Sequence, residues 1–157
     1  MQSLEDKRGP SLKFPPPLLP LTLIGIGYLI DVYLPLPINE YSALWLTGLV
    51  VVIASLCLAA IALIQFLRAK THIEPWQPTT FIIQSGIFRY SRNPIYLSFC
   101  VATLGCGLML NSWWVIAAVL PLIYLLQQLV IRHEESYLQQ KFGETYLAYK
   151  RRVRRWL

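Results

Sequence analysis

The chain has 157 residues, enough for one domain, and its composition is strongly apolar. Hydrophobic residues make up 55% of the sequence and charged residues 14%, against about a quarter charged in an ordinary soluble domain. A soluble fold of this size needs more polar surface than these residues supply. The composition therefore excludes an ordinary globular protein and indicates a single all-α integral membrane domain over residues 1–157.

Four apolar segments are expected to cross the membrane as helices, because about 20 apolar residues span its hydrocarbon core. Their approximate bounds are 18–34, 43–67, 94–110 and 112–131. The last two segments are separated only by Asn111 and its neighbours, which predicts a tight helical hairpin. The three cysteines lie in apolar segments without ligand spacing, so we expect neither a metal site nor a disulfide framework.

The orientation follows from the positions of lysine and arginine. All 14 of these residues fall before the first span, between the second and third, or after the fourth, and the other two loops have none. Cytoplasmic loops of membrane proteins carry the excess of basic residues. The sequence therefore predicts a multi-pass protein with both termini and a loop over residues 68–93 in the cytoplasm.

The tail is expected to form a cytosolic amphipathic helix over residues 132–157. Its apolar residues recur at intervals of three and four, the pattern of one helix face: Leu138, Phe142, Tyr146, Tyr149, Val153 and Trp156. Gly143 interrupts this pattern, and we expect a kink there. The basic end of the tail is expected to contact anionic lipid head groups, and nucleic-acid binding is not expected beside a membrane.

Two polar motifs, residues 86–96 and 132–135, lie at opposite ends of the predicted hairpin. A hairpin returns the chain to the same membrane face, so we expect the motifs to be neighbours. Ionisable groups at this boundary are costly unless they are paired or functional. Two interpretations stay open from the charges alone. The arginines can anchor helix ends and pair with the carboxylates, or the motifs can line a pocket for a zwitterionic, ring-bearing ligand.

The order of residues within the motifs is more specific. The sequence reads Ser85-Gly86-Ile87-Phe88-x-x-x-Arg92-Asn93-Pro94-x-Tyr96 and, after the hairpin, Glu134-Glu135-x-x-Leu138-x-x-x-Phe142-Gly143-x-x-Tyr146-x-x-Tyr149. This pattern resembles the isoprenylcysteine carboxyl methyltransferase family, whose bacterial members and the related phospholipid N-methyltransferases share this C-terminal half. The resemblance covers about residues 73–156, and the first two spans match only in being hydrophobic.

The resemblance implies an S-adenosylmethionine site formed by both motifs. Carried over by position, the cofactor-binding residues are Thr80, Phe81, Ile82, Ile83, Phe88, Asn93, Pro94, Ile95, Tyr96 and Glu134. A carboxylate can accept hydrogen bonds from the ligand's ammonium or ribose hydroxyls, and an aromatic ring can face the sulfonium in a cation–π contact. For positioning or proton removal, the catalytic candidates are Glu135, His133 and Arg132.

One position departs from the family pattern. The carboxyl methyltransferases are expected to hold the substrate carboxylate with an arginine four residues before the matched glutamate, and this chain has Val130 there. Arg132 follows two residues later, on a different side of a helix. The acceptor is therefore left open among lipid-like and prenylated molecules.

We expect S-adenosylmethionine-dependent methyl transfer to an amphiphilic or lipid-like acceptor at the cytoplasmic membrane face. The sulfonium is an activated donor, so the protein mainly aligns the reactants and excludes water. The alternative is a non-catalytic membrane scaffold or subunit that keeps the methyltransferase fold. A transporter fits less well, because the spans are nearly free of polar residues and show no inverted repeat with paired broken helices.

Overall fold

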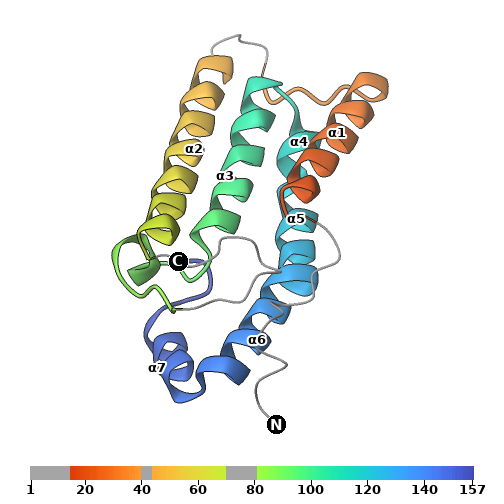
Figure 1. The fold of residues 1–157 in the computed structure, drawn as a ribbon. Helices are drawn as coiled ribbons and strands as arrows, with labels where there is room; N and C mark the ends of the chain where they lie inside the picture. The colour runs from red at the N-terminus through yellow and green to blue at the C-terminus, as the bar shows by residue number, and fades with distance from the viewer. Residues whose placement is uncertain (1–14, 40–43, 70–80) are drawn as a thin grey trace.

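The computed structural model describes residues 15–39, 44–69 and 81–157 as a helical protein. Figure 1 shows α1, α2, α3 and the α4–α5 segment grouped as a bundle, with α6 and α7 at one end. The α-helices are α1 (Leu18–Tyr33), α2 (Leu44–Arg68), α3 (Pro94–Met109), α4 (Trp113–Ala117), α5 (Val119–Leu126), α6 (Arg132–Phe142) and α7 (Glu144–Arg152). A 3₁₀ turn, η2 (Gly86–Arg89), precedes α3, and a π-helical turn, η3 (Gln127–Ile131), joins α5 to α6.

The four predicted apolar segments are all helical, with bounds close to the predicted ones. Among the described helices, α2 and the continuous helical run Trp113–Phe142 are long and apolar enough to cross a membrane. Only 11% of the most apolar window of α2 is buried inside the protein, so most of this helix presents apolar side chains outward. The helices α1 and α3 have 16 residues each and reach about 24 Å, less than the ~30 Å hydrocarbon core.

Helices α2 and α3 form the most extensive helix pair of the bundle, because two glycines let their backbones approach closely. A Cβ atom added at Gly48 would lie 2.5 Å from the carbonyl oxygen of Gly105 and 2.5 Å from the amide nitrogen of Met109. A Cβ atom added at Gly105 would lie 2.9 Å from the amide nitrogen of Val52. Small residues at such positions are typical of helix pairs in membranes.

The hairpin between α3 and α4 confirms the predicted tight turn. Asn111 has a φ of 52°, and its side-chain oxygen accepts hydrogen bonds from the backbone of Ile38 at 3.1 Å and of Asn39 at 3.2 Å. The hydroxyl of Ser112 donates to Asp31 at 2.8 Å. These contacts tie the end of α1 and the segment after it to the hairpin.

The predicted helix over residues 132–157 begins at Arg132 as α6 and is interrupted at Gly143, where a kink was predicted, but it forms two helices and ends at Arg152. Helix α6 continues the fourth apolar segment through η3, so the helical run ends only at Phe142. No proline or glycine separates residues 131 and 132, and a polar side chain alone does not end a helix. The run stops at Gly143, whose φ of 51° is open to glycine, and α7 then ends at Arg152.

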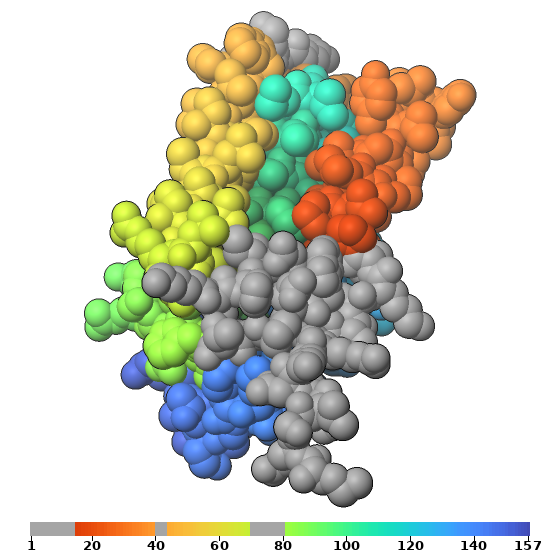
Figure 2. Space-filling view, in the orientation of Figure 1, coloured from red at the N-terminus to blue at the C-terminus, as the bar shows by residue number. Residues whose placement is uncertain are grey.

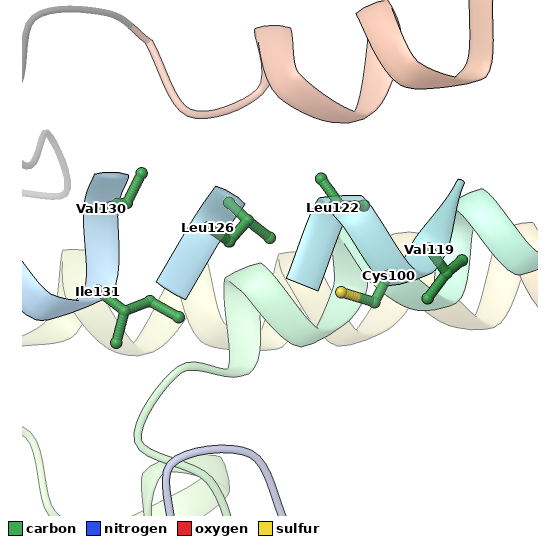
Figure 3. Close-up of a cluster of buried hydrophobic side chains, with 6 residues drawn as sticks. All are labelled: Cys100, Val119, Leu122, Leu126, Val130 and Ile131. Carbon is green, nitrogen blue, oxygen red and sulfur yellow. The ribbon is translucent and has the colours of Figure 1, made fainter. Parts of the chain in front are cut away.

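The main core joins α3 to the helical run that starts at α4. Its buried residues, drawn in Figure 3, are Cys100, Val119, Leu122, Leu126, Val130 and Ile131. The apolar stripe predicted on the tail forms a second cluster, in which Tyr146, Tyr149 and Val153 pack with Ile82. The stripe therefore packs against the segment that leads to η2, and Trp156 packs against the main core instead.

Candidate functional site

The turn at Ser85 and Gly86 is fixed against α2. Gly86 has a φ of 59°, a conformation that favours glycine. The side-chain amide of Gln65 donates to the carbonyl of Ser85 at 3.3 Å and accepts from the amide of Ile87 at 3.2 Å. A Cβ atom at Gly86 would overlap this amide at 2.0 Å. The glycine therefore allows the close contact that holds the turn.

Phe88 anchors the next residues between α2 and α7. Its ring packs edge-on against Phe66, with the ring centroids 5.4 Å apart. Its carbonyl accepts a hydrogen bond from the hydroxyl of Tyr149 at 2.7 Å, and burial raises the pKa of that hydroxyl. Phe88, Ile83 and Ala62 form a small buried cluster. These contacts fix the approach of the chain to the start of α3.

The residues before Pro94, which occupies the first turn of α3, bind the end of the chain. The side-chain amide of Asn93 donates to the carbonyl of Arg155 at 3.0 Å, and the hydroxyl of Ser91 donates to the same oxygen at 3.4 Å. The backbone amide of Arg92 donates to the carbonyl of Arg154 at 3.1 Å. The first motif is therefore joined to a segment about 60 residues later.

Three cations surround the buried carboxylate of Glu135. Arg155 donates two hydrogen bonds to it, from Nε at 2.9 Å and from Nη2 at 2.8 Å, and these bonds raise the pKa of Arg155. Arg92 Nη2 lies 3.2 Å from Oε1 and Lys150 Nζ lies 3.9 Å from Oε2. A buried carboxylate persists only with such pairing. Glu135 thus joins α6 to the segment before α3, to α7 and to the segment after α7.

Arg92 is the most enclosed of these cations, with a side chain that is 8% exposed. Its Nη1 donates to the hydroxyl of Tyr146 at 3.4 Å, and burial raises the pKa of that tyrosine to about 12. Its Nε is buried and has no hydrogen-bond partner among the residues that the structure describes. A buried donor without an acceptor is costly, so this atom suits a ligand oxygen.

Tyr96 and Glu134 meet next to this charged cluster. The hydroxyl of Tyr96, on the first turns of α3, donates to Oε1 of Glu134 on α6. The Tyr96 ring also lies 6.0 Å from the ring of Phe99 and contacts the main core. Both residues are half-buried. The structure therefore brings the two predicted motifs together, as the hairpin predicted.

The other residues predicted for the site lie at different places. Ile95 packs against the cluster of Phe88 and Ile83, and Ile82 packs against α7. Phe81 is 62% exposed, and Thr80 lies outside the described residues. Of the catalytic candidates, Glu135 is buried among its cations, whereas Arg132 and His133 are exposed on α6.

Sequence reasoning missed three site residues: Tyr146, Lys150 and Arg155. The sequence pattern places Tyr146 in the apolar stripe, and its hydroxyl gives no separate signal. The sequence predicts that the two basic residues contact lipid head groups, but both lie beside Glu135. Two adjacent carboxylates at a membrane boundary require cations nearby, and this requirement was the signal that could have pointed to the basic tail.

Comparison with known proteins relates the chain to membrane methyltransferases. It matches the phospholipid methyltransferase family over residues 42–145. Two rice proteins (Oryza sativa subsp. indica and japonica), each named a probable protein-S-isoprenylcysteine O-methyltransferase, are 26% identical over 137 residues, which cover 86% of this chain and 72% of theirs. An uncharacterized protein of Haemophilus influenzae is 40% identical over 63 residues, 40% of this chain and all of that protein.

A solved structure has a similar fold. It is that of a eukaryotic intramembrane Ras methyltransferase, isoprenylcysteine carboxyl methyltransferase, with a TM-score of 0.67 and 20% identity. The match covers 87% of this chain but 50% of that protein, so the chain spans about half the length of the solved relative. At this identity the likeness concerns the fold, and the fold is that of a membrane protein with helical spans.

The family match covers more than half of the chain and includes η2, the motif that starts α3, and α6. The matched residues include the Tyr96–Glu134 pair and two of the four members of the ion-pair cluster, Arg92 and Glu135. Members of this family use S-adenosylmethionine. The chain therefore belongs to the phospholipid methyltransferase family of membrane methyltransferases, to which the isoprenylcysteine carboxyl methyltransferases are related.

Proposed function

We propose that this chain transfers a methyl group from S-adenosylmethionine to an amphiphilic or lipid-like acceptor at the cytoplasmic membrane face. The observation that carries the proposal is the meeting of the two motifs. Tyr96 and Glu134 form a hydrogen-bonded pair. Four residues before Tyr96, Arg92 has a buried Nε that lacks a hydrogen-bond acceptor among the described residues.

The polar groups at this place fit the cofactor. Arg92 Nε can donate to a carboxylate, and Glu134 can accept from an ammonium or from ribose hydroxyls. The ring of Tyr96 can face a sulfonium. S-adenosylmethionine bound there would supply an already activated methyl group, so these residues need only orient the donor and exclude water.

We assign different roles to the three catalytic candidates. Glu135 is engaged by three cations, so we propose that it positions Arg92 and Arg155 and does not take a proton. His133 is exposed and stays a candidate for taking a proton from an amine acceptor. A carboxylate acceptor needs no base. Arg132 is exposed on α6 and lines a polar pocket between α6 and α7.

The acceptor is proposed to enter from the membrane. Figure 2 shows the molecule hollowed between α1 and α2, with the surface of α3 at the floor. Both flanking helices present large apolar side chains outward, such as Leu21 and Leu29 on α1 and Leu56 on α2. We propose that α1 and α3 also cross the membrane as short helices, and that a lipid chain lies in the hollow. A prenylated or an acylated acceptor fits equally.

Calorimetry of the detergent-solubilised protein with S-adenosylhomocysteine tests the cofactor site. We expect the wild type to bind and Glu134→Gln and Tyr96→Phe to weaken binding about tenfold or more, ~1.4 kcal/mol, because each loses a polar contact to the ligand or its partner. The control is Glu144→Gln on α7, an exposed residue paired only with exposed Arg151 among the described residues, and its affinity stays unchanged. A folded wild type that does not bind contradicts the proposal.

A second candidate function is the non-catalytic scaffold. The observation that favours it is Val130, which is fully buried in the main core where the resemblance leads us to expect a substrate-binding arginine. Incubating the protein with methyl-labelled cofactor and a lipid extract separates the two functions. Mass spectrometry finds a labelled lipid if the chain is an enzyme, and finds none despite cofactor binding if it is a scaffold.

A further inference from the structure

A polar pocket of about 310 Å³ opens between α6 and α7, and neither Tyr96 nor Glu134 lines it. Its lining residues are Arg132, Glu135, Ser136, Gln139, Gln140 and Lys150. The volume is at the small end of the range for ligand pockets, about 300–1,000 Å³. Apart from Glu135, its lining offers hydrogen-bond donors: two cations, two amides and a hydroxyl.

The charges around this pocket do not cancel. The carboxylate of Glu135 is already bound by Arg155 with two hydrogen bonds and by Arg92 at 3.2 Å. Lys150 reaches it only at 3.9 Å, and the lysine side chain is 37% exposed. Arg132 forms no hydrogen bond or ion pair with any residue that the structure describes. Two cations at the pocket are therefore left to attract an anion.

The methyl-transfer site lies on another face of the same helix. Glu134 turns toward Tyr96 on α3, whereas Arg132, Ser136 and Gln139 recur at helical spacing on the pocket side. A ligand bound in the pocket would therefore not contact Tyr96 or Glu134. The inference goes beyond the proposed function and does not rest on it.

The position of the pocket along the helical run indicates a membrane surface. Residues 113–131 extend about 28 Å as a helix, close to the ~30 Å thickness of the hydrocarbon core. Arg132 follows immediately and so lies at the level of the head groups, and the other α6 residues of the pocket lie one or two turns further out. Arginine and lysine at this level attract anionic lipid.

We infer that this pocket binds a phosphate group, most simply the phosphate of an anionic lipid head group held by Arg132 and Lys150. The two cations form charge-assisted hydrogen bonds to the phosphate oxygens, and Ser136, Gln139 and Gln140 donate further bonds. Glu135 stays neutralised by Arg155 and Arg92 and does not repel the ligand. The site fastens α6 and α7 to the lipid surface beside the methyl-transfer site.

Calorimetry on the full-length protein in neutral detergent tests this site with two probes. One arm uses dihexanoyl phosphatidic acid and the other uses inorganic phosphate. We expect the lipid to bind the wild type, and the double variant Arg132→Gln, Lys150→Gln to lose about tenfold or more in affinity. The matched control is Arg151→Gln, which removes one charge from the exposed side of α7 and keeps the affinity within about twofold. A thermal melt verifies that each variant is folded.

The outcomes are distinct. Equal affinity for both probes, lost in the double variant, supports the phosphate site and identifies free phosphate as its ligand. Stronger lipid binding, lost in the same variant, supports the head-group site. The inference is overturned if the folded wild type binds neither probe, if Arg151→Gln loses as much as the double variant, or if saturating S-adenosylhomocysteine displaces the lipid.

Discussion

Glu135 lies on α6 with its carboxylate between three cations. Arg92 comes from the segment before α3, Lys150 from α7 and Arg155 from the segment after α7. A charge buried in this way is costly, and attraction within the cluster offsets the cost only when its members are all present. The cluster therefore contributes more to a unique arrangement of these segments than to net stability.

Removing the central carboxylate is expected to destabilise the protein strongly. Glu135→Gln leaves the buried Arg92 and the half-buried Arg155 without their counter-charge, so we expect a loss of about 3–5 kcal/mol, seen as a lower melting temperature in detergent. Glu144→Gln breaks only the exposed pair with Arg151 and costs less than about 1 kcal/mol. Equal melting temperatures for the two variants would show that the cluster is not needed for the fold.

At the scale of single residues, the sequence predicted the Tyr96–Glu134 meeting because both residues belong to motifs at the two ends of one hairpin. It did not predict that Arg155 reaches Glu135. That contact depends on the reversal of the chain at Gly143, and no local pattern fixes the direction that the chain takes after a glycine. The sequence shows that position 130 is a valine, but only the structure shows that its side chain is buried in the core.

At the scale of helices, the packing of α2 on α3 depends on small residues. We expect Gly48→Ala to destabilise the protein by about 1–3 kcal/mol, because the new Cβ would lie 2.5 Å from backbone atoms of α3 that move only with the helix. Gly25 in α1 provides the matched control, because a Cβ there meets nothing within 4 Å. Melting curves of Gly48→Ala and Gly25→Ala in the same detergent make the comparison.

In this comparison Gly25→Ala is expected to melt at or slightly above the temperature of the wild type, since alanine favours a helix over glycine by about 1 kcal/mol. If Gly48→Ala has the same melting temperature as Gly25→Ala, α2 and α3 do not pack as closely as described.

The sequence predicted the existence and most bounds of the helices, because long apolar runs leave few alternatives. The sequence did not predict that the helical run continues without a break past residue 131, and the reason is physical. Arg132 marks the level at which the helix leaves the apolar layer, but the backbone hydrogen bonds of a helix continue through polar residues. The helix ends at Gly143, where the backbone adopts a positive φ. The residue at which a helix leaves the membrane and the residue at which the helix ends are therefore different positions.

At the scale of the whole molecule, the described basic residues gather at one end. Arg68 ends α2, Arg89 and Arg92 precede α3, and the remainder lie on α6, α7 and the residues after them. Figure 1 shows these element ends at the same end of the bundle. We therefore propose one orientation in the membrane, with this end in the cytoplasm.

Cysteine labelling tests this orientation. In a background where Cys57, Cys100 and Cys106 are replaced by alanine, we expect Leu36→Cys to react with an impermeant maleimide added outside intact cells. Leu157→Cys is expected to react only in inside-out vesicles. Both positions are well exposed, so access by the reagent and not burial decides the result. The reverse pattern would invert the orientation and place the site on the other membrane face.

The hydrogen bonds from Ser91 and Asn93 to the carbonyl of Arg155 join parts of the chain that a ribosome makes at different times. Arg155 is synthesised 62 residues after Asn93, and α3, α6 and α7 are all made in the interval. During that interval the polar groups at the start of α3 have water in place of their final partners. A nascent chain halted within α7 thus has all its apolar helices but not its charged cluster.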